Sequence, residues 1–188
     1  AGVLRGHRET VHPLTYLRDT RATKADAALK ALAASVDAAT DALDLAHKLS
    51  STVAGAIAYR PGVTEMHTTA AEALALGEGV CQDHAHALIA LARLRDLPAR
   101  YVSGYLHSTV DGQPHDAAHA WAEIHVGGLG WVGFDAANGC CPDDRYVRLG
   151  SGLDASDAAP IRGVATGTTA GAGAERLDVA VQVEEIGQ

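Results

Sequence analysis

Apolar residues recur with a helical period through the first half of the chain. Residues 1–20 show no sustained period, and we expect an irregular leader there. From Thr20 the sequence is rich in Ala and predicts a helix, because apolar residues stand at i, i+3 and i+7 from Leu29. A second helix is predicted over residues 37–59, where one apolar stripe repeats every four residues across positions 45–57.

Two further helices are predicted in the middle of the chain. Thr68 or Thr69 can cap a short helix over residues 70–76. Two glycines then break the pattern, and a longer helix is predicted from Cys81 to about Arg95. Because this last helix is apolar over much of its circumference, we expect it to be central and largely buried.

The apolar period changes to two after Pro98, which indicates strands. The predicted strands cover residues 101–106, 119–126, 131–135, 145–149 and 176–185. A Gly-rich turn joins the second strand to the third and is typical of a hairpin. The Gly/Thr/Ala-rich segment 163–175 is expected to be a flexible loop. Helices followed by an antiparallel sheet, without an internal repeat, indicate a single α+β domain over residues 1–188.

The composition and charge exclude several classes of protein. Of the 188 residues, 47% are hydrophobic but 38 are Ala, so we expect a core of small side chains. The net charge of −8 argues against a nucleic-acid binder, which needs a basic face, and against an anionic membrane surface. No stretch reaches the 18 apolar residues of a membrane span, and no signal-peptide pattern is visible.

The three cysteines favour a reducing, cytoplasmic setting. Cys140 and Cys141 are adjacent, which suits neither an ordinary disulfide nor a Cys-x-x-Cys zinc site, and Cys81 is then a free thiol. Cys81 opens a predicted helix, whose partial positive charge and unpaired N–H groups favour a thiolate nucleophile and an oxyanion. The alternative role for Cys81 is that of a small buried core residue.

A histidine and an aspartate in the predicted hairpin suit the chemistry of such a thiol. His119 opens one strand, from which an imidazole can take the thiol proton and pass it to a leaving amine. Asp135 ends the other arm, where a carboxylate can hold that imidazole in one tautomer. The simpler alternatives are a structural histidine and a turn aspartate. Pairing position 126 with 131 places Asp135 opposite Ala122, so a bulge or another register is needed to reach His119.

Three sequence blocks carry a resemblance to a known family. They are GVCQDHAHALIALARLRDLPARYVSGYL around Cys81, AHAWAEIHV around His119 and GWVGFDAANG around Asp135. In this order and spacing the chain resembles the transglutaminase-like superfamily. More narrowly, it is similar to bacterial transglutaminase-like proteins that are described as candidate cysteine proteases. The likeness covers about residues 8–186.

The resemblance implies a fold, a set of site residues and an activity. The fold would be a papain-like α+β core, with N-terminal helices packed on an antiparallel sheet. Cys81, His119 and Asp135 would be a catalytic triad that transfers an acyl group from a peptide or protein amide through a thioester, with no cofactor or metal. Full-length bacterial relatives usually carry a further N-terminal β-rich domain that is absent from residues 1–188, so we expect this chain to be the catalytic domain alone.

Departures from the family bear on the reaction. Animal cross-linking transglutaminases place a Trp upstream of the cysteine to hold the oxyanion, whereas both Trp residues here lie downstream of Cys81. This difference favours hydrolysis, as in a protease or amidase, while transfer to an amine, as in a transglutaminase, stays the alternative. Gln82, Tyr59 and Trp121 are candidates for substrate or oxyanion contacts, and Trp121 suits core packing equally well. No acidic cluster resembles a calcium site.

Two other functions compete with the enzyme hypothesis. The same fold can serve as a non-catalytic binding module. A zinc hydrolase would need converging histidines, but His84 and His86 would point roughly 200° apart on a helix. His115 and His119 have the i, i+4 spacing of helical zinc ligands, yet they lie in a segment predicted to contain a strand.

Overall fold

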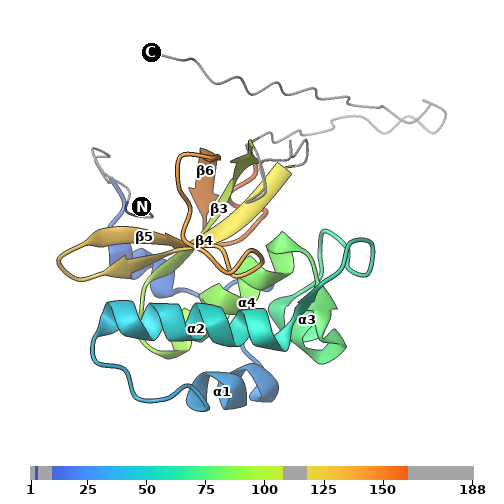
Figure 1. Cartoon of the computed structure of the whole chain (residues 1–188), viewed down its shortest axis with the longest axis horizontal. Helices are drawn as coiled ribbons and strands as arrows, with labels where there is room; N and C mark the ends of the chain where they lie inside the picture. Colours follow the sequence, from blue (N-terminus) through green and yellow to red (C-terminus); the bar gives the residue numbers. More distant parts are fainter. Residues whose placement is uncertain (1–2, 4–9, 108–117, 161–188) are drawn as a thin grey trace, which may run out of the picture.

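The computed structural model of the protein describes residues 3, 10–107 and 118–160. The α-helices gather on one side of a four-stranded antiparallel sheet with strand order β5-β4-β3-β6 (Figure 1). The helical elements are η1 (Pro13–Leu17), α1 (Ala27–Ala34), α2 (Ala42–Ala56), α3 (Ala70–Leu76) and α4 (Cys81–Leu94). The strands are β1 (Ala58–Tyr59), β2 (Glu78–Gly79), β3 (Ala99–Leu106), β4 (Ala118–Val126), β5 (Gly130–Phe134) and β6 (Tyr146–Gly152). This architecture confirms the predicted α+β class.

The first three α-helices begin at side chains that cap them. Asp26 caps α1 and Asp41 caps α2, each accepting a hydrogen bond of 2.8 Å from the backbone N–H three residues further on. The helices predicted from Thr20 and over residues 37–59 are therefore too long, because the chain reaches its capping residue only at these positions. Thr69 starts α3 with a complete capping box, as predicted.

The predicted irregular leader contains one ordered turn. Pro13 starts the short 3-10 helix η1, since its fixed φ angle suits a first helical position. Tyr16 within this turn is buried, and its ring contacts Trp131 edge-on at a centroid distance of 5.2 Å. The leader expected over residues 1–20 to be irregular, with one short extended piece, thus contains a helical turn that the sequence analysis did not predict.

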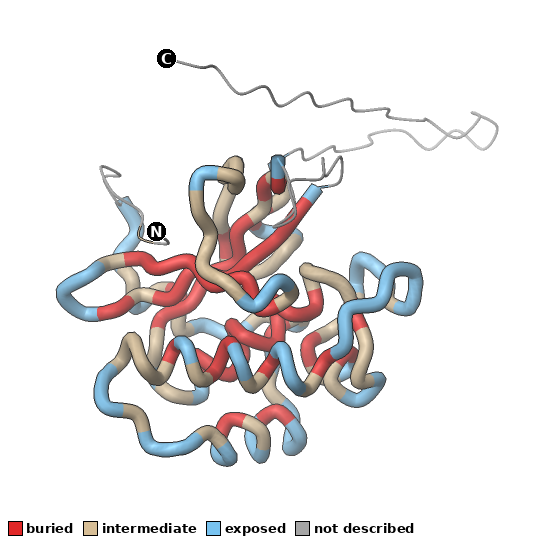
Figure 2. Tube along the Cα trace, in the orientation of Figure 1, coloured by how far each residue is buried: buried red, intermediate tan, exposed pale blue. Residues whose placement is uncertain are grey.

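Helix α4 is the central element of the fold, as its apolar sequence predicts. All residues from Asp83 to Arg93 are buried, and the other α-helices and the sheet surround them (Figure 2). At the end of α4 the buried Arg93 guanidinium donates to four oxygen atoms. These are Tyr16 O, Thr23 Oγ1, Ala99 O and Leu153 O, at 2.7–3.0 Å. The helix that begins with Cys81 is therefore anchored to the sheet and to the N-terminal segment.

The β4–β5 hairpin has a different register from the one counted along the sequence. The turn pairs Val126 with Gly130, one residue earlier than counted, because two glycines in it adopt positive φ angles. Extending this register by one residue places Asp135 opposite Trp121. Asp135 therefore shares a sheet face with His119, two residues away on β4, and no bulge is needed in this hairpin.

A bulge occurs instead between β3 and β6, where the register shifts between Ser103 and Gly104. A Cβ atom added to Gly104 would lie 2.1 Å from Val147 O and 2.8 Å from the Trp121 ring. Glycine is required here because strand β6 and the indole approach β3 too closely for any side chain.

The C-terminal strand predicted over residues 176–185 and the loop predicted over 163–175 lie outside the described residues. The short strand predicted over 145–149 is present and extends to Gly152 as β6. Among the helices that the structure describes, none combines the length and apolar character needed to cross a membrane.

Candidate active site

Cys81 is the first residue of α4, and only the N-cap residue Val80 separates it from the short strand β2. The turn before it is held by the buried Asp83, whose Oδ2 accepts from Val80 N–H at 2.8 Å and from Thr64 Oγ1 at 2.6 Å. A Cβ atom on Gly79 would lie 2.7 Å from this carboxylate, so glycine allows the close approach. The sequence thus places the Cys81 sulfur at the positive end of a rigid helix.

His119 and Asp135 form a buried ion pair on the sheet face that looks toward this helix start. His119 Nε2 lies 2.6 Å from Asp135 Oδ2, and the two residues are 6% and 1% exposed. Burial lowers the pKa of His119, but hydrogen bonds and charges of Asp135 and Cys81 outweigh it and raise the pKa to about 9. Burial raises the pKa of Asp135, but His119 and other donors lower it overall. At neutral pH the pair is imidazolium and carboxylate.

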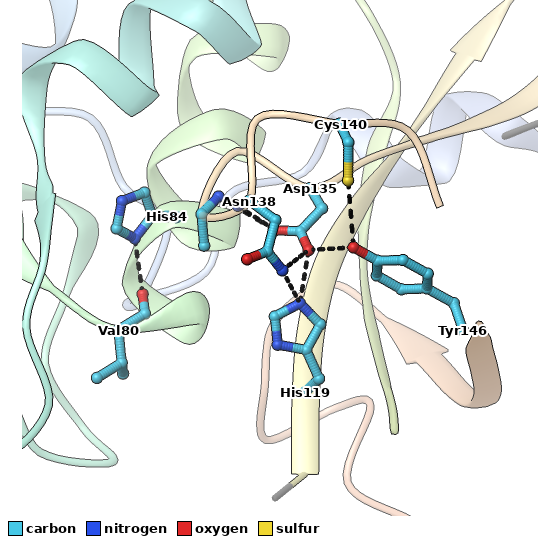
Figure 3. A network of polar contacts seen from close by, with 8 residues as sticks. Val80, His84, His119, Asp135, Asn138, Cys140 and Tyr146 are labelled. Carbon is cyan, nitrogen blue, oxygen red and sulfur yellow. Dashed lines mark hydrogen bonds and ion pairs between the residues drawn. The ribbon is translucent and has the colours of Figure 1, made fainter. Parts of the chain in front are cut away.

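Asp135 accepts hydrogen bonds from five donors. Its Oδ1 accepts from the backbone N–H groups of Ala137 and Asn138 at 3.1 and 3.2 Å. Its Oδ2 accepts from Asn138 Nδ2 at 2.7 Å and from the Tyr146 hydroxyl at 2.8 Å, as well as from His119 (Figure 3). Asp135 therefore stabilises the turn and is also the partner of His119. The two roles that the sequence offered as alternatives are both filled by this carboxylate.

Cys81 is the second partner of the His119 imidazole. After the hydrogen bond of Asp135, a hydrogen bond with Cys81 and the charge of Cys81 are further causes of the raised pKa of His119, so the sulfur lies within reach of the ring. Since Nε2 faces Asp135, Nδ1 is the nitrogen left for the sulfur. The imidazole thus has the thiol at the helix start as one partner and the carboxylate as another, and such a set can pass a proton from sulfur to a leaving group.

A cleft of about 280 Å³ opens beside Cys81 and His119. Its other lining residues among those described carry no charge; they are Val80, Gln82, Tyr101, Ser103, Gly104, Tyr105, Ala118, Ala120, Leu149 and Pro160. Because the sulfur lies at the cleft wall, an uncharged group that enters the cleft would meet it.

The three candidate contact residues lie at different places around the site. Gln82 lines the cleft, but its side-chain amide donates to Met66 O at 3.0 Å. Tyr59 is 53% exposed, and burial together with the negative charges of Cys81 and Asp135 raises its pKa. Trp121 does not line the cleft. It is buried and stacks on His119 at a centroid distance of 6.3 Å, so it screens the His119 pair from water.

Asn138 and Tyr146 are site residues that the sequence analysis missed. Asn138 follows Asp135 by three residues in a turn sequence, and that spacing is a local signal for a side chain that folds back on the aspartate. Tyr146 comes from β6 and has no local signal, because only the sheet topology brings it to Asp135. Cys140 contacts the Tyr146 hydroxyl at 3.3 Å and extends the network (Figure 3).

The histidines of α4 are engaged separately. His84 contacts two backbone carbonyls, whereas His86 Nε2 accepts from Ala155 N–H at 3.1 Å. His115 lies outside the described residues. Within the part of the chain that the structure describes, no three His, Cys, Asp or Glu side chains gather as metal ligands would.

Comparison with known proteins places this site in a family. The family model of the transglutaminase-like superfamily matches residues 30–136, more than half of the chain, and this range includes Cys81, His119 and Asp135. The chain belongs to the transglutaminase-like superfamily. The resemblance seen in the three sequence blocks is thereby confirmed.

Curated relatives of this superfamily member come from mycobacteria. An uncharacterised protein of Mycobacterium leprae is 37% identical over 136 residues, which are 68% of this chain and 45% of the relative. An uncharacterised protein of Mycobacterium tuberculosis is 36% identical over 133 residues, 65% of this chain and 42% of the relative. The chain therefore spans less than half the length of these relatives.

Solved structures share the transglutaminase-like core. A candidate cysteine protease from Cytophaga hutchinsonii matches with a TM-score of 0.68 and 29% identity, over 78% of this chain and 48% of that one. The periplasmic domain of TgpA from Pseudomonas aeruginosa matches with a TM-score of 0.52 and 24% identity, over 68% and 49% of the two chains. The second likeness concerns the fold alone. Together with the family match, these structures confirm the expected papain-like arrangement of helices on an antiparallel sheet.

Proposed function

We propose that this superfamily member is a cysteine-dependent acyl-transfer enzyme that acts on amide carbonyls of peptides or proteins. The observation that carries the proposal is the buried 2.6 Å bond between His119 and Asp135, with Cys81 as the second partner of the same imidazole. The superfamily match and the likeness to the candidate cysteine protease of C. hutchinsonii support it. In this proposal Cys81, His119 and Asp135 are the nucleophile, the acid–base and the orienting carboxylate.

The first half of the proposed reaction makes a thioester. The thiol proton resides on His119, because the pKa of this imidazolium is about 9 and Cys81 stands at a helix start. The sulfur bonds to the carbonyl carbon, and the resulting oxyanion faces the N–H groups of the first turn of α4. His119 then protonates the amine as the carbon–nitrogen bond breaks, which leaves the acyl group on Cys81.

The second half of the proposed reaction regenerates the enzyme. His119, now neutral, takes a proton from an attacking water molecule, the acid forms and the sulfur leaves as a thiolate beside the imidazolium. The absence of an upstream Trp favours water over an amine as the attacking group. Asp135 holds the ring throughout, and its five donors keep the carboxylate from turning.

Trapping an acyl-enzyme tests this proposal directly. The full chain is mixed with a library of peptide amides and esters with uncharged side chains, quenched in acid, and analysed by intact mass and peptide mapping. We expect an acyl adduct on Cys81, and none in Cys81→Ala. Cys141→Ser, which changes a cysteine outside the hydrogen-bond network of Asp135, is the matched control and should form the same adduct as the parent.

Two outcomes would overturn the proposal. One is an adduct that persists in Cys81→Ala at the level of the parent. The other is the absence of any adduct, together with no release of acid or amine from the library, which would favour a non-catalytic binding module on the same fold.

A further inference from the structure

His84 contacts a backbone carbonyl with each of its ring nitrogens. Nδ1 lies 2.9 Å from Val80 O and Nε2 lies 2.9 Å from Ile57 O (Figure 3 shows the first of these contacts). The residue is only 2% exposed. The ring therefore bridges the end of α2, where Ile57 follows the last helical residue, and the turn that starts α4.

Carbonyl oxygens accept hydrogen bonds but cannot donate them, whereas a neutral imidazole has one donor and one acceptor nitrogen. A neutral ring would direct a lone pair at one of the two carbonyls at hydrogen-bonding distance. Both contacts are satisfied only when both nitrogens carry a proton. We infer that His84 is held as an imidazolium between Val80 O and Ile57 O, and that it is a positioning residue for the Cys81 nucleophile.

The surroundings of the ring suit a buried cation. The phenol ring of Tyr59, on β1, lies at a centroid distance of 6.4 Å. Along α4 the nearest ionisable groups are Asp83, which is adjacent, His86, which is two residues away, and Cys81, which is one turn away. Among the described residues, no carboxylate forms an ion pair with His84, so the two carbonyl dipoles are its direct partners.

His86 on the same helix provides the contrast. It is equally buried, but its Nε2 accepts from Ala155 N–H, so that nitrogen carries no proton. Burial lowers the pKa of His86 to about 4. Two buried histidines spaced two residues apart on α4 therefore differ in charge because one faces acceptors and the other faces a donor.

His84 acts on Cys81 through its hydrogen bond to Val80 O and through its positive charge. This part of the inference rests on the proposed function. The Val80 carbonyl, which also accepts from the backbone N–H groups of Asp83 and His84 at 3.0 and 3.2 Å, shares one planar peptide group with the Cys81 N–H. The His84 ring is therefore a further donor on this oxygen and adds to the bonds that fix the N–H proposed to face the oxyanion. Hydrogen bonding to the oxygen also polarises the group and strengthens its N–H as a donor. Residues 81 and 84 are neighbours at i, i+3, where a positive charge favours the thiolate.

The first test needs no variant. Nitrogen NMR of the full chain, labelled at the histidine ring nitrogens, reports whether each nitrogen carries a proton. At pH 7 we expect the imidazolium signature for His84, with both nitrogens protonated, and the single-donor signature for His86. A His84 ring with one unprotonated nitrogen at pH 7 would overturn the inference.

The second test compares His84→Gln with the matched control His86→Gln. The readout is the pH of half-maximal alkylation of Cys81 by iodoacetamide, with peptide mapping to separate it from the other cysteines. Loss of a charge one helical turn away should move this midpoint upward by about one pH unit in His84→Gln. His86→Gln should keep the midpoint of the parent.

The outcomes separate this inference from the proposed function. If Cys81 is alkylated at equally low pH in the parent and in His84→Gln, the positioning role of His84 is overturned and the proposed function stands. If Cys81 of the parent behaves as an ordinary thiol, the proposed function fails, while the ring-nitrogen measurement still decides the charge of His84. Equal shifts in both variants would show a general packing effect and would overturn the positioning role.

Discussion

Replacing Asp135 by Asn tests how strictly the site is built around a carboxylate. Oδ1 accepts from two backbone N–H groups, and Oδ2 accepts from His119, Asn138 and Tyr146. An Asn side chain has one oxygen and one NH2 group, which donates. Whichever way the amide is turned, the NH2 group meets at least two donors. Asp135→Asn therefore loses at least two hydrogen bonds.

The expected cost follows from these bonds. A hydrogen bond to a charged group contributes about 1.5–3 kcal/mol, so the loss of two should lower the free energy of unfolding by about 3–6 kcal/mol. Part of this loss depends on pH. The His119 pKa is about 9 in the folded protein against an ordinary value of 6.5. This difference corresponds to about 3 kcal/mol of stabilisation, and Asp135 is its largest favourable cause.

The sign of the pH dependence is fixed because the folded pKa of His119 is the higher one. Its stabilisation is fully present below pH 6.5 and is lost as the pH rises through about 9. The difference in unfolding free energy between the parent and Asp135→Asn should therefore be largest near pH 6 and narrow toward alkaline pH.

Urea unfolding followed by circular dichroism, at several pH values across this range, measures the stability difference. An NMR titration of His119 measures its pKa in both proteins. Asp44→Asn, which changes a half-buried carboxylate in the first turn of α2, is the control and should leave the His119 titration unchanged. The reasoning is refuted if Asp135→Asn unfolds like the parent near pH 6, or if its His119 still titrates near the parental value.

Three further substitutions probe the frame of the site. Tyr146→Phe removes the hydroxyl that donates to Asp135 at 2.8 Å. Losing the roughly 1 kcal/mol by which this hydrogen bond holds Asp135 in position should slow acyl-enzyme formation by roughly three- to tenfold. An unchanged rate would exclude this positioning role. Gly104→Ala places a Cβ atom 2.1 Å from a carbonyl oxygen of β6 and should lower the unfolding free energy by about 2 kcal/mol or more, whereas a stable variant would contradict the close approach. Glu123→Gln breaks a buried ion pair with Arg100 at 2.6 Å and should lower the free energy of unfolding in urea by about 3–5 kcal/mol, whereas a variant as stable as the parent would contradict the contribution of this pair.

The helices around the site could be predicted, because they depend on residues close together in the sequence. The apolar circumference of residues 81–94 predicts a central helix, and the structure buries it from Asp83 to Arg93. Thr69 stands before a short run of helix formers, and its capping box fixes the start of α3. The position of Cys81 at a helix start follows from the same kind of local pattern, since Gly79 interrupts the helical pattern just before it.

Other features depend on geometry that local patterns do not carry. The hairpin register was uncertain by one residue, because it depends on which glycines take positive φ in the turn. That single residue decides whether Asp135 faces His119. Tyr146 reaches Asp135 only through the pairing of β6 with β3, which no spacing in the sequence indicates.

The most direct measurement of the central claim is the rate of Cys81 alkylation by iodoacetamide as a function of pH, in the parent and in His119→Ala. The pKa of the His119 imidazolium is about 9, so the positive charge of this ring beside the sulfur should keep Cys81 reactive well below pH 8. Burial raises the pKa values of Cys140 and Cys141, so these two thiols should react only at higher pH. His119→Ala should remove this advantage. If Cys81 loses its reactivity at the same pH as the other two thiols, or if His119→Ala leaves its profile unchanged, the account is contradicted.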